Sequence, residues 1–360
     1  MRLGGLRLER ARGSKQFRDG SFHNTHEAKI TRALDGPRTP VVREWLFERA
    51  KRRPPGAIPV GSPLEAWTKP VESGLRVTWL GHSTNLLELD GLRVLTDPVF
   101  GTRLGPVSFA GPKRFHAPPV TVAQLPKLDA ILISHDHFDH LCKSTVTELA
   151  KLDVPIVTSL GVGAHLEHFG VPAVRIVELD WGEQHALPGG ALQFTAQPAQ
   201  HFSGRVGGRN ATLWSSWVIE TARRKVFFSG DTGLTPEFAD IRAQHGPFEL
   251  TLLEIGAWHP AWGTVHLGPA NALKAFELLG GGTLMPVHWA TFDLGLDQWA
   301  EPAETLWRLA AANHQRIVTP RLGIPFEPTH VEQPEPWWRE VGAESIVHNR
   351  IDNNPIADYR

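Results

Sequence analysis

A short polar segment carries the strongest chemical signal in the sequence. Residues 135–140 read His-Asp-His-Phe-Asp-His, so four donor side chains stand close together at His135, His137, Asp139 and His140. Neutral imidazole combined with carboxylate is a donor set that suits zinc, and also iron or manganese. Burying that many ionisable groups without a cation would cost much free energy, because each group loses its hydration. The segment therefore predicts a metal site.

Three further donors follow apolar runs elsewhere in the chain. His201, Asp231 and His288 come after the strand-like runs 191–197, 225–229 and 282–287. A single such histidine is more typical of ordinary packing, but the set at strand ends favours metal ligation. The assignment that we predict gives His135, His137 and His201 to a first metal, Asp139, His140 and His288 to a second, and Asp231 to both as a bridge.

Two neighbouring metal ions predict hydrolysis, because a bridging water between them loses a proton near neutral pH and the resulting hydroxide is the nucleophile. Asp139 is a candidate catalytic residue as well as a ligand. His266 is a candidate for stabilising the developing charge or protonating the leaving group. Asp97 either holds a ligand imidazole by a hydrogen bond or caps a turn before Pro98. His82 is either a similar support or a structural residue at a tight turn.

The sequence contains few signals for other types of chemistry. The sequence has neither a phosphate-binding loop of the Gly-x-x-x-x-Gly-Lys-Ser/Thr type nor a Gly-x-Ser-x-Gly elbow. The Gly-rich stretch 204–208, with Arg205 and Arg209, is either a contact for an anionic substrate or, more in keeping with its composition, a flexible hairpin tip. The single cysteine, Cys142, excludes an intrachain disulfide and fits a small apolar helix residue better than a nucleophile.

The composition narrows the classes of protein. Among 360 residues, 37 Lys+Arg stand against 38 Asp+Glu, and the net charge of -1 argues against nucleic acid as a partner. No apolar run reaches the roughly 18 residues of a membrane span. No apolar segment follows the basic start Met1–Lys15, so we expect a cytoplasmic protein, with peripheral membrane contact as a hypothesis. The 13 Trp either line a groove or, as we favour, fill the core.

The elements that must position these residues begin near residue 75. Strand-like runs joined by the turn signal Asp90-Gly91 come first, and strands then alternate with helices, a pattern that predicts two packed sheets with helices outside. We expect strands at 75–80, 85–89, 92–96, 129–134, 154–159, 174–179, 191–197, 212–220, 225–229, 250–255 and 282–287. We expect helices at 143–152, 162–169, 234–244, 269–279 and 304–311. The Gly/Pro-rich stretch 101–126 predicts a long functional loop.

Three regions follow from this pattern. Residues 1–70 lack periodicity and predict an N-terminal arm with one short helix near 41–51, packing on a hydrolase domain over 71–330. The arm is a candidate for wrapping the domain, covering the site or helping to form a homodimer. Its basic residues 51–53 either lie on a solvated surface or contact acidic lipid headgroups. Residues 331–360 form a C-terminal tail.

The motifs resemble the metallo-β-lactamase superfamily, and most closely its N-acyl-phosphatidylethanolamine-hydrolysing phospholipase D family with its bacterial relatives. The resemblance runs from about residue 75 to 300 and includes stretches that metal binding does not need: 95–100, 111–115, 178–181, 198–201, 246–248 and 288–292. It implies a four-layer αββα sandwich, two Zn²⁺ per chain and phosphodiester hydrolysis, with His266 as a catalytic-site histidine. At 258–262 this chain has Trp-His-Pro-Ala-Trp where the family commonly has Tyr-Glu-Pro-Arg-Trp, which changes the rim of the site.

The leading hypothesis is thus a zinc-dependent phosphodiesterase of the phospholipase D type, acting on N-acyl-phosphatidylethanolamine-like lipids or on another small molecule. A lactonase, or another ester or amide hydrolase of the same fold, is the first alternative. A nuclease would need a basic surplus that the chain lacks. A non-catalytic metal-binding sensor is the last alternative, and the complete set of donors speaks against it.

Overall fold

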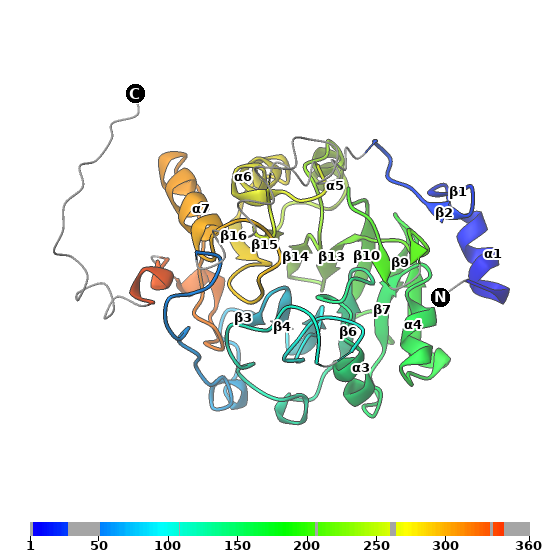
Figure 1. Cartoon of the computed structure of the whole chain (residues 1–360), viewed down its shortest axis with the longest axis horizontal. Helices are drawn as coiled ribbons and strands as arrows, with labels where there is room; N and C mark the ends of the chain where they lie inside the picture. Colours follow the sequence, from blue (N-terminus) through cyan, green and yellow to red (C-terminus); the bar gives the residue numbers. More distant parts are fainter. Residues whose placement is uncertain are drawn as a thin grey trace.

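Two mixed sheets form the middle of the molecule (Figure 1). The computed structural model describes residues 3–27, 51–107, 109–205, 208–259, 264–331 and 334–341. The first sheet has six strands in the order β3 (Leu75–Gly81), β4 (Thr84–Leu89), β5 (Leu92–Thr96), β6 (Ala130–Ile133), β7 (Ile156–Ser159) and β8 (Ile176–Leu179). Its first three strands are antiparallel and the rest run parallel, so that β5 to β8 end at one edge.

The second sheet also has six strands and faces the first. Its order is β16 (Thr283–Val287), β15 (Leu250–Glu254), β14 (Lys225–Phe228), β13 (Ser216–Glu220), β10 (Gln193–Gln197) and β9 (Gln184–Ala186). The strands β14, β15 and β16 are parallel neighbours and therefore also end at a common edge.

Helices cover the outer faces of both sheets (Figure 1). α3 (Lys143–Leu149) and α4 (Gly163–His168) pack on the first sheet, whereas α5 (Glu237–His245), α6 (Gly268–Leu278) and α7 (Glu301–Ala312) pack on the second. The predicted four-layer αββα sandwich is confirmed. No helix in the described ranges combines the length and the apolar character needed to cross a bilayer.

The strand β6 shows why its sequence is apolar throughout. Ala130 and Leu132 face the core between the sheets, while Ile131 and Ile133 face the core under α3 and α4. A parallel strand with both faces covered needs an unbroken apolar run, and side chains alternate between the two faces. The strand ends at the edge of the sheet, and the polar segment 135–140 begins just beyond it.

The loops and short elements differ from the prediction in places. The hairpin turn at Asp90-Gly91 is present, with φ of 49° and 88°, as a two-residue turn of this kind requires. The helix α1 (Gly5–Gly13) lies in the arm where none was predicted, because it has little apolar periodicity, and the helix predicted near 41–51 lies almost wholly outside the described residues. Residues 212–215 do not join β13, and β9 was missed because Gln-His-Ala carries no strand signal.

The remaining elements are short. They are the strands β1 (Phe17–Arg18), β2 (Ser21–Phe22), β11 (Gly204–Arg205) and β12 (Gly208–Arg209), and the 3-10 turns Ala66–Thr68, Val122–Gln124, Ala173–Arg175, Pro328–His330 and Trp337–Glu340. The described part of the loop 101–126 contains a single isolated bridge, between Arg103 and Lys113, and one 3-10 turn.

The most buried tryptophans fill the core and do not line a groove. Trp79, Trp214, Trp217 and Trp337 are all nearly inaccessible to solvent. The ring of Trp337 lies 5.3 Å from that of Trp289 and 6.3 Å from that of Trp79, measured between centroids. Since Trp289 follows the candidate ligand His288, the segment 334–341 packs behind the candidate site.

We expect Trp337→Ala to lower the free energy of unfolding by about 3–5 kcal/mol, because truncating a buried indole loses its transfer free energy and leaves a cavity. Urea denaturation followed by tryptophan fluorescence measures this loss. Val174→Ala is the control, since Val174 is 92% exposed and its truncation should change the free energy of unfolding by no more than about 0.5 kcal/mol. Equal stability of the two variants would contradict the packing described for Trp337.

Candidate metal centre

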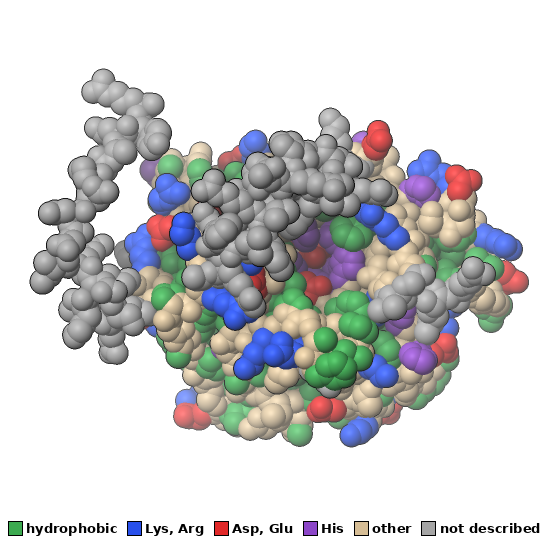
Figure 2. Space-filling model, viewed as in Figure 1, with side chains coloured by type: hydrophobic (Ala, Val, Ile, Leu, Met, Phe, Trp, Pro, Cys, Tyr) green, Lys and Arg blue, Asp and Glu red, His purple; other side chains and the backbone are tan. Residues whose placement is uncertain are grey.

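The predicted metal ligands converge at one edge of the sandwich. They follow the carboxyl ends of strands from both sheets: residues 135–140 follow β6, His201 follows β10, Asp231 follows β14 and His288 follows β16. Figure 2 shows histidine side chains at the bottom of a hollow on this face, with hydrophobic side chains directly below them in that view. The two sheets thus bring together all seven residues that the sequence singled out as ligands.

The first group of donors consists of His135, His137, His201 and Asp231. The Nδ1 atom of His137 lies 2.9 Å from Nε2 of His135 and 3.2 Å from Nε2 of His201. Oδ2 of Asp231 lies 3.8 Å from Nε2 of His135 and 3.7 Å from Nε2 of His201. One donor atom from each residue therefore faces a common point, with all four atoms within 4.8 Å of one another.

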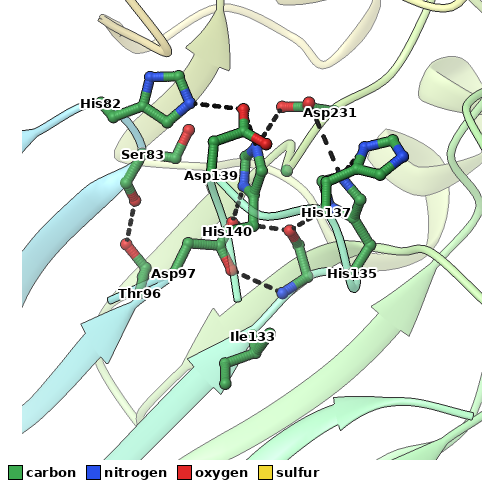
Figure 3. A network of polar contacts seen from close by, with 12 residues as sticks. His82, Ser83, Thr96, Asp97, Ile133, His135, His137, Asp139, His140 and Asp231 are labelled. Carbon is green, nitrogen blue, oxygen red and sulfur yellow. Dashed lines mark hydrogen bonds and ion pairs between the residues drawn. The ribbon is translucent and has the colours of Figure 1, made fainter. Parts of the chain in front are cut away.

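The second group consists of Asp139, His140 and His288. It lies next to the first group, and Asp231 faces both (Figure 3). Oδ2 of Asp139 is 3.2 Å from Nε2 of His288 and 3.5 Å from Nε2 of His140. The Asp231 carboxylate places Oδ1 3.2 Å from Nε2 of His140 and Oδ2 3.2 Å from Nε2 of His288. Asp231 therefore lies between the two groups, the position of a bridging ligand.

Hydrogen bonds on the outer sides of the imidazoles turn their lone pairs inward. The Nδ1–H of His201 donates to the carbonyl oxygen of Val265 over 2.8 Å, because a carbonyl can only accept. The Nδ1–H of His140 donates to Oδ2 of Asp97 over 2.7 Å. Nε2 of His140 and Oδ1 of Asp231 are buried without a hydrogen-bond partner among the described residues. Inward lone pairs and orphaned acceptors fit a bound cation.

The charges of the cluster also suit a cation. Burial, together with the neighbouring His140, holds the pKa of His135 well below its ordinary value. Burial raises the pKa of Asp231, but His140 and His288 outweigh it and hold that pKa well below the ordinary value. Burial lowers the pKa of His140, but Asp231 and Asp139 raise it well above the ordinary value. The ionised carboxylates thus stabilise positive charge at this point.

Asp97 supports both groups from below (Figure 3). Besides accepting from His140, it accepts from the backbone N–H of Ser134 over 2.7 Å and from the Ser134 hydroxyl over 2.7 Å. Because that hydroxyl proton goes to Asp97, the Ser134 oxygen is left to accept from Nδ1–H of His135 over 2.9 Å. Asp97 is fully buried, and its contacts with His140 and Ser134 go beyond capping the turn before Pro98.

His82 combines the two roles that the sequence left open. Its Nε2 lies 2.9 Å from Oδ2 of Asp139, and its ring centroid lies 4.0 Å from that of His288. Its carbonyl oxygen also accepts from the backbone N–H of His288 over 3.1 Å. Positive φ values of 54° at His82, 34° at Asp97 and 65° at His288 are uncommon outside glycine. Such backbone conformations gather at functional sites, where the surrounding structure maintains them.

A buried carboxylate next to the donors escaped the sequence analysis. Oε2 of Glu254 accepts from Nδ1–H of His266 over 2.6 Å, and its Oε1 accepts from the backbone N–H of Thr232, next to Asp231, over 2.8 Å. Burial lowers the pKa of His266, but Glu254 raises it above the ordinary value. The available signal was a glutamate that ends the apolar run 250–254 at the same sheet edge as the ligands.

Arg205 lies in a hairpin, as one of the two interpretations expected, because β11 pairs with β12, but its side chain has a role that neither interpretation included. Its Nη1 donates to the carbonyl oxygens of Asp136 over 2.7 Å and Leu141 over 2.8 Å, so it braces the segment that carries four of the donors. Its guanidinium lies 4.0 Å from the ring centroid of Phe138. Arg209 lies nearby over Phe202, at 4.7 Å from the ring centroid.

Cys142 is buried beside Ser144 and belongs to neither donor group.

Comparisons with known proteins agree with this geometry. The family model of the beta-lactamase superfamily domain matches residues 92–289. An uncharacterized protein of Mycobacterium tuberculosis is 44% identical over 91% of this chain and 88% of its own length. The N-acyl-phosphatidylethanolamine-hydrolyzing phospholipase D 1 of Caenorhabditis elegans is 36% identical over 67% of this chain and 71% of its own length.

Solved structures repeat the fold at low sequence identity. An isothiocyanate hydrolase from Delia radicum gut bacteria is superposable with a TM-score of 0.57 at 20% identity, over 70% of this chain and 98% of that one. This likeness concerns the fold alone. With the family model, the relatives and the donor clusters together, the chain is a metal-dependent hydrolase that belongs to the metallo-β-lactamase superfamily, and N-acyl-phosphatidylethanolamine-hydrolysing phospholipases D are among its relatives.

Proposed function

We propose that this hydrolase is a zinc-dependent phosphodiesterase of the phospholipase D type, acting on N-acyl-phosphatidylethanolamine-like lipids. The observation that carries the proposal is the Asp231 carboxylate, which faces both donor groups at once. In this proposal His135, His137 and His201 would hold one Zn²⁺, Asp139, His140 and His288 would hold a second, and Asp231 would be a ligand of both. A pair of ions is suited to both the attacking and the leaving oxygen of a phosphodiester.

Two bound ions would supply a water of lowered pKa and would polarise the phosphoryl oxygen. The remaining chemistry belongs to side chains of the chain. His266 donates Nδ1–H to Glu254, so its Nε2 is left to hold the proton that the leaving oxygen needs. His82 contacts Asp139 and so orients this carboxylate, for which we propose a catalytic role besides ligation.

Apolar side chains around the donors support a lipid substrate. Phe138 and Phe202 are both partly exposed, and the Phe202 ring lies 4.7 Å from that of His137. Leu294 and Phe138 pack against a small buried cluster that contains Leu104 and Phe292. Acyl chains gain free energy beside such surfaces because they leave water. The sequence relation to the phospholipase of Caenorhabditis elegans supports the same substrate class.

The direct test is a substrate comparison with zinc-loaded enzyme. We expect N-acyl-phosphatidylethanolamine to yield phosphatidic acid and N-acylethanolamine, and we expect bis(p-nitrophenyl) phosphate to be hydrolysed as well. Lactones and carboxylic esters are the comparison substrates. Turnover of lactones without turnover of either phosphodiester, at full metal occupancy, would overturn the proposal in favour of a lactonase. No turnover of any substrate would favour a metal-binding sensor.

A loop beside the centre is our candidate for contact with the lipid surface. Its described residues 103–107 and 109–113 are closed by the bridge between Arg103 and Lys113 and anchored by the buried Leu104. Phe109 and Val107 are 79% and 41% exposed at its tip. The whole stretch 101–126 contains cations but no acidic residue. An apolar tip with a basic base suits an anionic bilayer surface.

We expect Phe109→Ser to weaken binding to vesicles of mixed phosphatidylcholine and phosphatidylglycerol by roughly tenfold to a hundredfold, the equivalent of burying one phenyl side chain in lipid. Co-sedimentation over a range of lipid concentrations measures this partition. Val174→Ser is the matched control, because Val174 is 92% exposed on the turn before β8, at the edge of the first sheet opposite the strand ends that carry the donors. Equal binding of wild type and Phe109→Ser would contradict membrane contact through this tip.

A further inference from the structure

The N-terminal segment 3–27 is tied to the hydrolase domain by ion pairs. In α1, Arg7 pairs with Glu167 and Glu178, and Arg10 pairs with Glu183. These contacts join residues more than 150 positions apart in the sequence, and a local sequence pattern therefore does not predict them. The helix has no apolar stripe of its own, so its arginines and the residues that follow account for its position.

An apolar cluster continues the docking toward the metal centre. Ala11 and Phe22 from the segment pack with Leu213 and Trp214, all of them fully buried. Ala199, two residues before the candidate ligand His201, belongs to the same cluster. Burial of this kind holds the segment in a defined place, since each buried side chain contributes on the order of 1–3 kcal/mol.

Asn24 is the point where the segment meets the centre. Its Nδ2–H donates to the carbonyl oxygen of His201 over 2.8 Å, and its Oδ1 accepts from the backbone N–H of His201 over 3.0 Å. The indole Nε1–H of Trp214 also donates to Oδ1 over 3.0 Å, which orients the amide. One side chain therefore satisfies both backbone polar groups of a candidate metal ligand.

His201 needs this support because it lies outside the sheet. It follows β10 by four residues, and none of the strands in the described part of the chain pairs with its backbone. Its side chain has a separate support, the carbonyl oxygen of Val265 on Nδ1. The backbone position and the direction of the ring are thus set by different residues, and the first of these comes from the N-terminal segment.

We propose that Asn24 is a positioning residue of the metal centre and that the N-terminal segment is thereby a structural part of the group formed by His135, His137 and His201. The inference goes beyond the proposed phosphodiesterase activity, because it concerns metal affinity and holds for any substrate. Outer partners that orient ligands commonly change metal affinity by 10–100-fold when they are removed.

The test is a Co²⁺ titration of metal-free full-length protein, read by visible absorption. We expect Asn24→Ala to weaken one of two Co²⁺ binding events by about 10–100-fold and to leave the other within about threefold of wild type. His23→Ala is the control, because the His23 side chain hydrogen-bonds to Ser21 and Arg18 within its own segment and not to His201. Wild-type affinity for both events in Asn24→Ala would overturn the proposal, and so would equal weakening of both.

Two further variants keep the test decisive if Asn24→Ala fails to fold. Asn24→Asp retains the acceptor for the His201 N–H but places a carboxylate oxygen against the His201 carbonyl, so we expect the same selective weakening. Arg10→Ala loosens α1 through a largely exposed ion pair and should fold normally, with a smaller effect on the same binding event. No selective change in either folded variant would refute the proposal. Because the readout is Co²⁺ binding, it stays independent of whether phospholipids are hydrolysed.

Discussion

Asp231→Ala is expected to remove most of the bound zinc and to lower kcat/KM by more than about a hundredfold, since even outer partners of metal ligands commonly cost 10–100-fold. The two Asp231 oxygens face His140 and His288 at 3.2 Å, and the same carboxylate reaches toward His135 and His201. Removing it takes a negative charge from both donor groups at once. Metal analysis of purified protein, together with phosphodiesterase assays, measures the two effects.

Asp240→Ala is the matched control, because Asp240 is an exposed aspartate of the nearby helix α5. It loses the same charge without touching a donor, so zinc content and activity should equal those of the wild type. If Asp231→Ala retained two zinc ions per chain and lost only activity, the carboxylate would be a catalytic group and not the bridge that we propose.

The donor positions could be read from the sequence because each follows a recognisable strand. An apolar run such as 130–133 has to end at the edge of its sheet, and parallel strands end at the same edge. His135, Asp231 and His288 therefore had to approach one another once two sheets were packed together. The same logic predicted the layers and most strand positions, with boundaries displaced by a few residues, for example 216–220 in place of 212–220.

What the sequence could not show depends on long-range contacts between unremarkable residues. Asn24 is 177 positions from His201, and nothing in the arm marks it as a partner of the metal centre. Glu254 ends an apolar strand, and its role at the site becomes apparent only from its hydrogen bond with His266 over 2.6 Å. Arg205 was interpreted as a substrate contact or as part of a hairpin tip. The hairpin is present, but the backbone carbonyls to which Arg205 donates belong to the metal-binding segment.

The contacts that hold the donor side chains in place were only partly predictable from the sequence. His82 and Asp97 each had two open interpretations, because a sequence does not separate a turn residue from a supporting one. Both have positive φ and both contact a donor side chain, so the tight turn is what delivers the supporting group. At both positions the turn places the side chain that supports a donor. The structural role and the supporting role therefore occur together and are not alternatives.

His266→Gln is expected to lower kcat for a phospholipid by about a hundredfold to ten-thousandfold while zinc content stays at the wild-type level, the range typical of losing a general acid. An alkoxide leaving group needs a proton as the phosphorus–oxygen bond breaks. Glutamine retains an N–H that can donate to Glu254, so this buried carboxylate is not left without a partner. Steady-state kinetics with N-acyl-phosphatidylethanolamine measure the loss.

Bis(p-nitrophenyl) phosphate separates this role from a purely structural one. Nitrophenolate leaves without a proton, so His266→Gln should reduce kcat for this substrate by less than about tenfold if the residue acts as a general acid. Glu254→Gln keeps an oxygen that can accept from the Thr232 N–H but removes the negative charge beside His266, and it should show a smaller effect with the same dependence on the leaving group. An equal loss with both substrates in His266→Gln would mean that His266 shapes the centre or stabilises charge on the phosphoryl group and does not protonate the leaving oxygen.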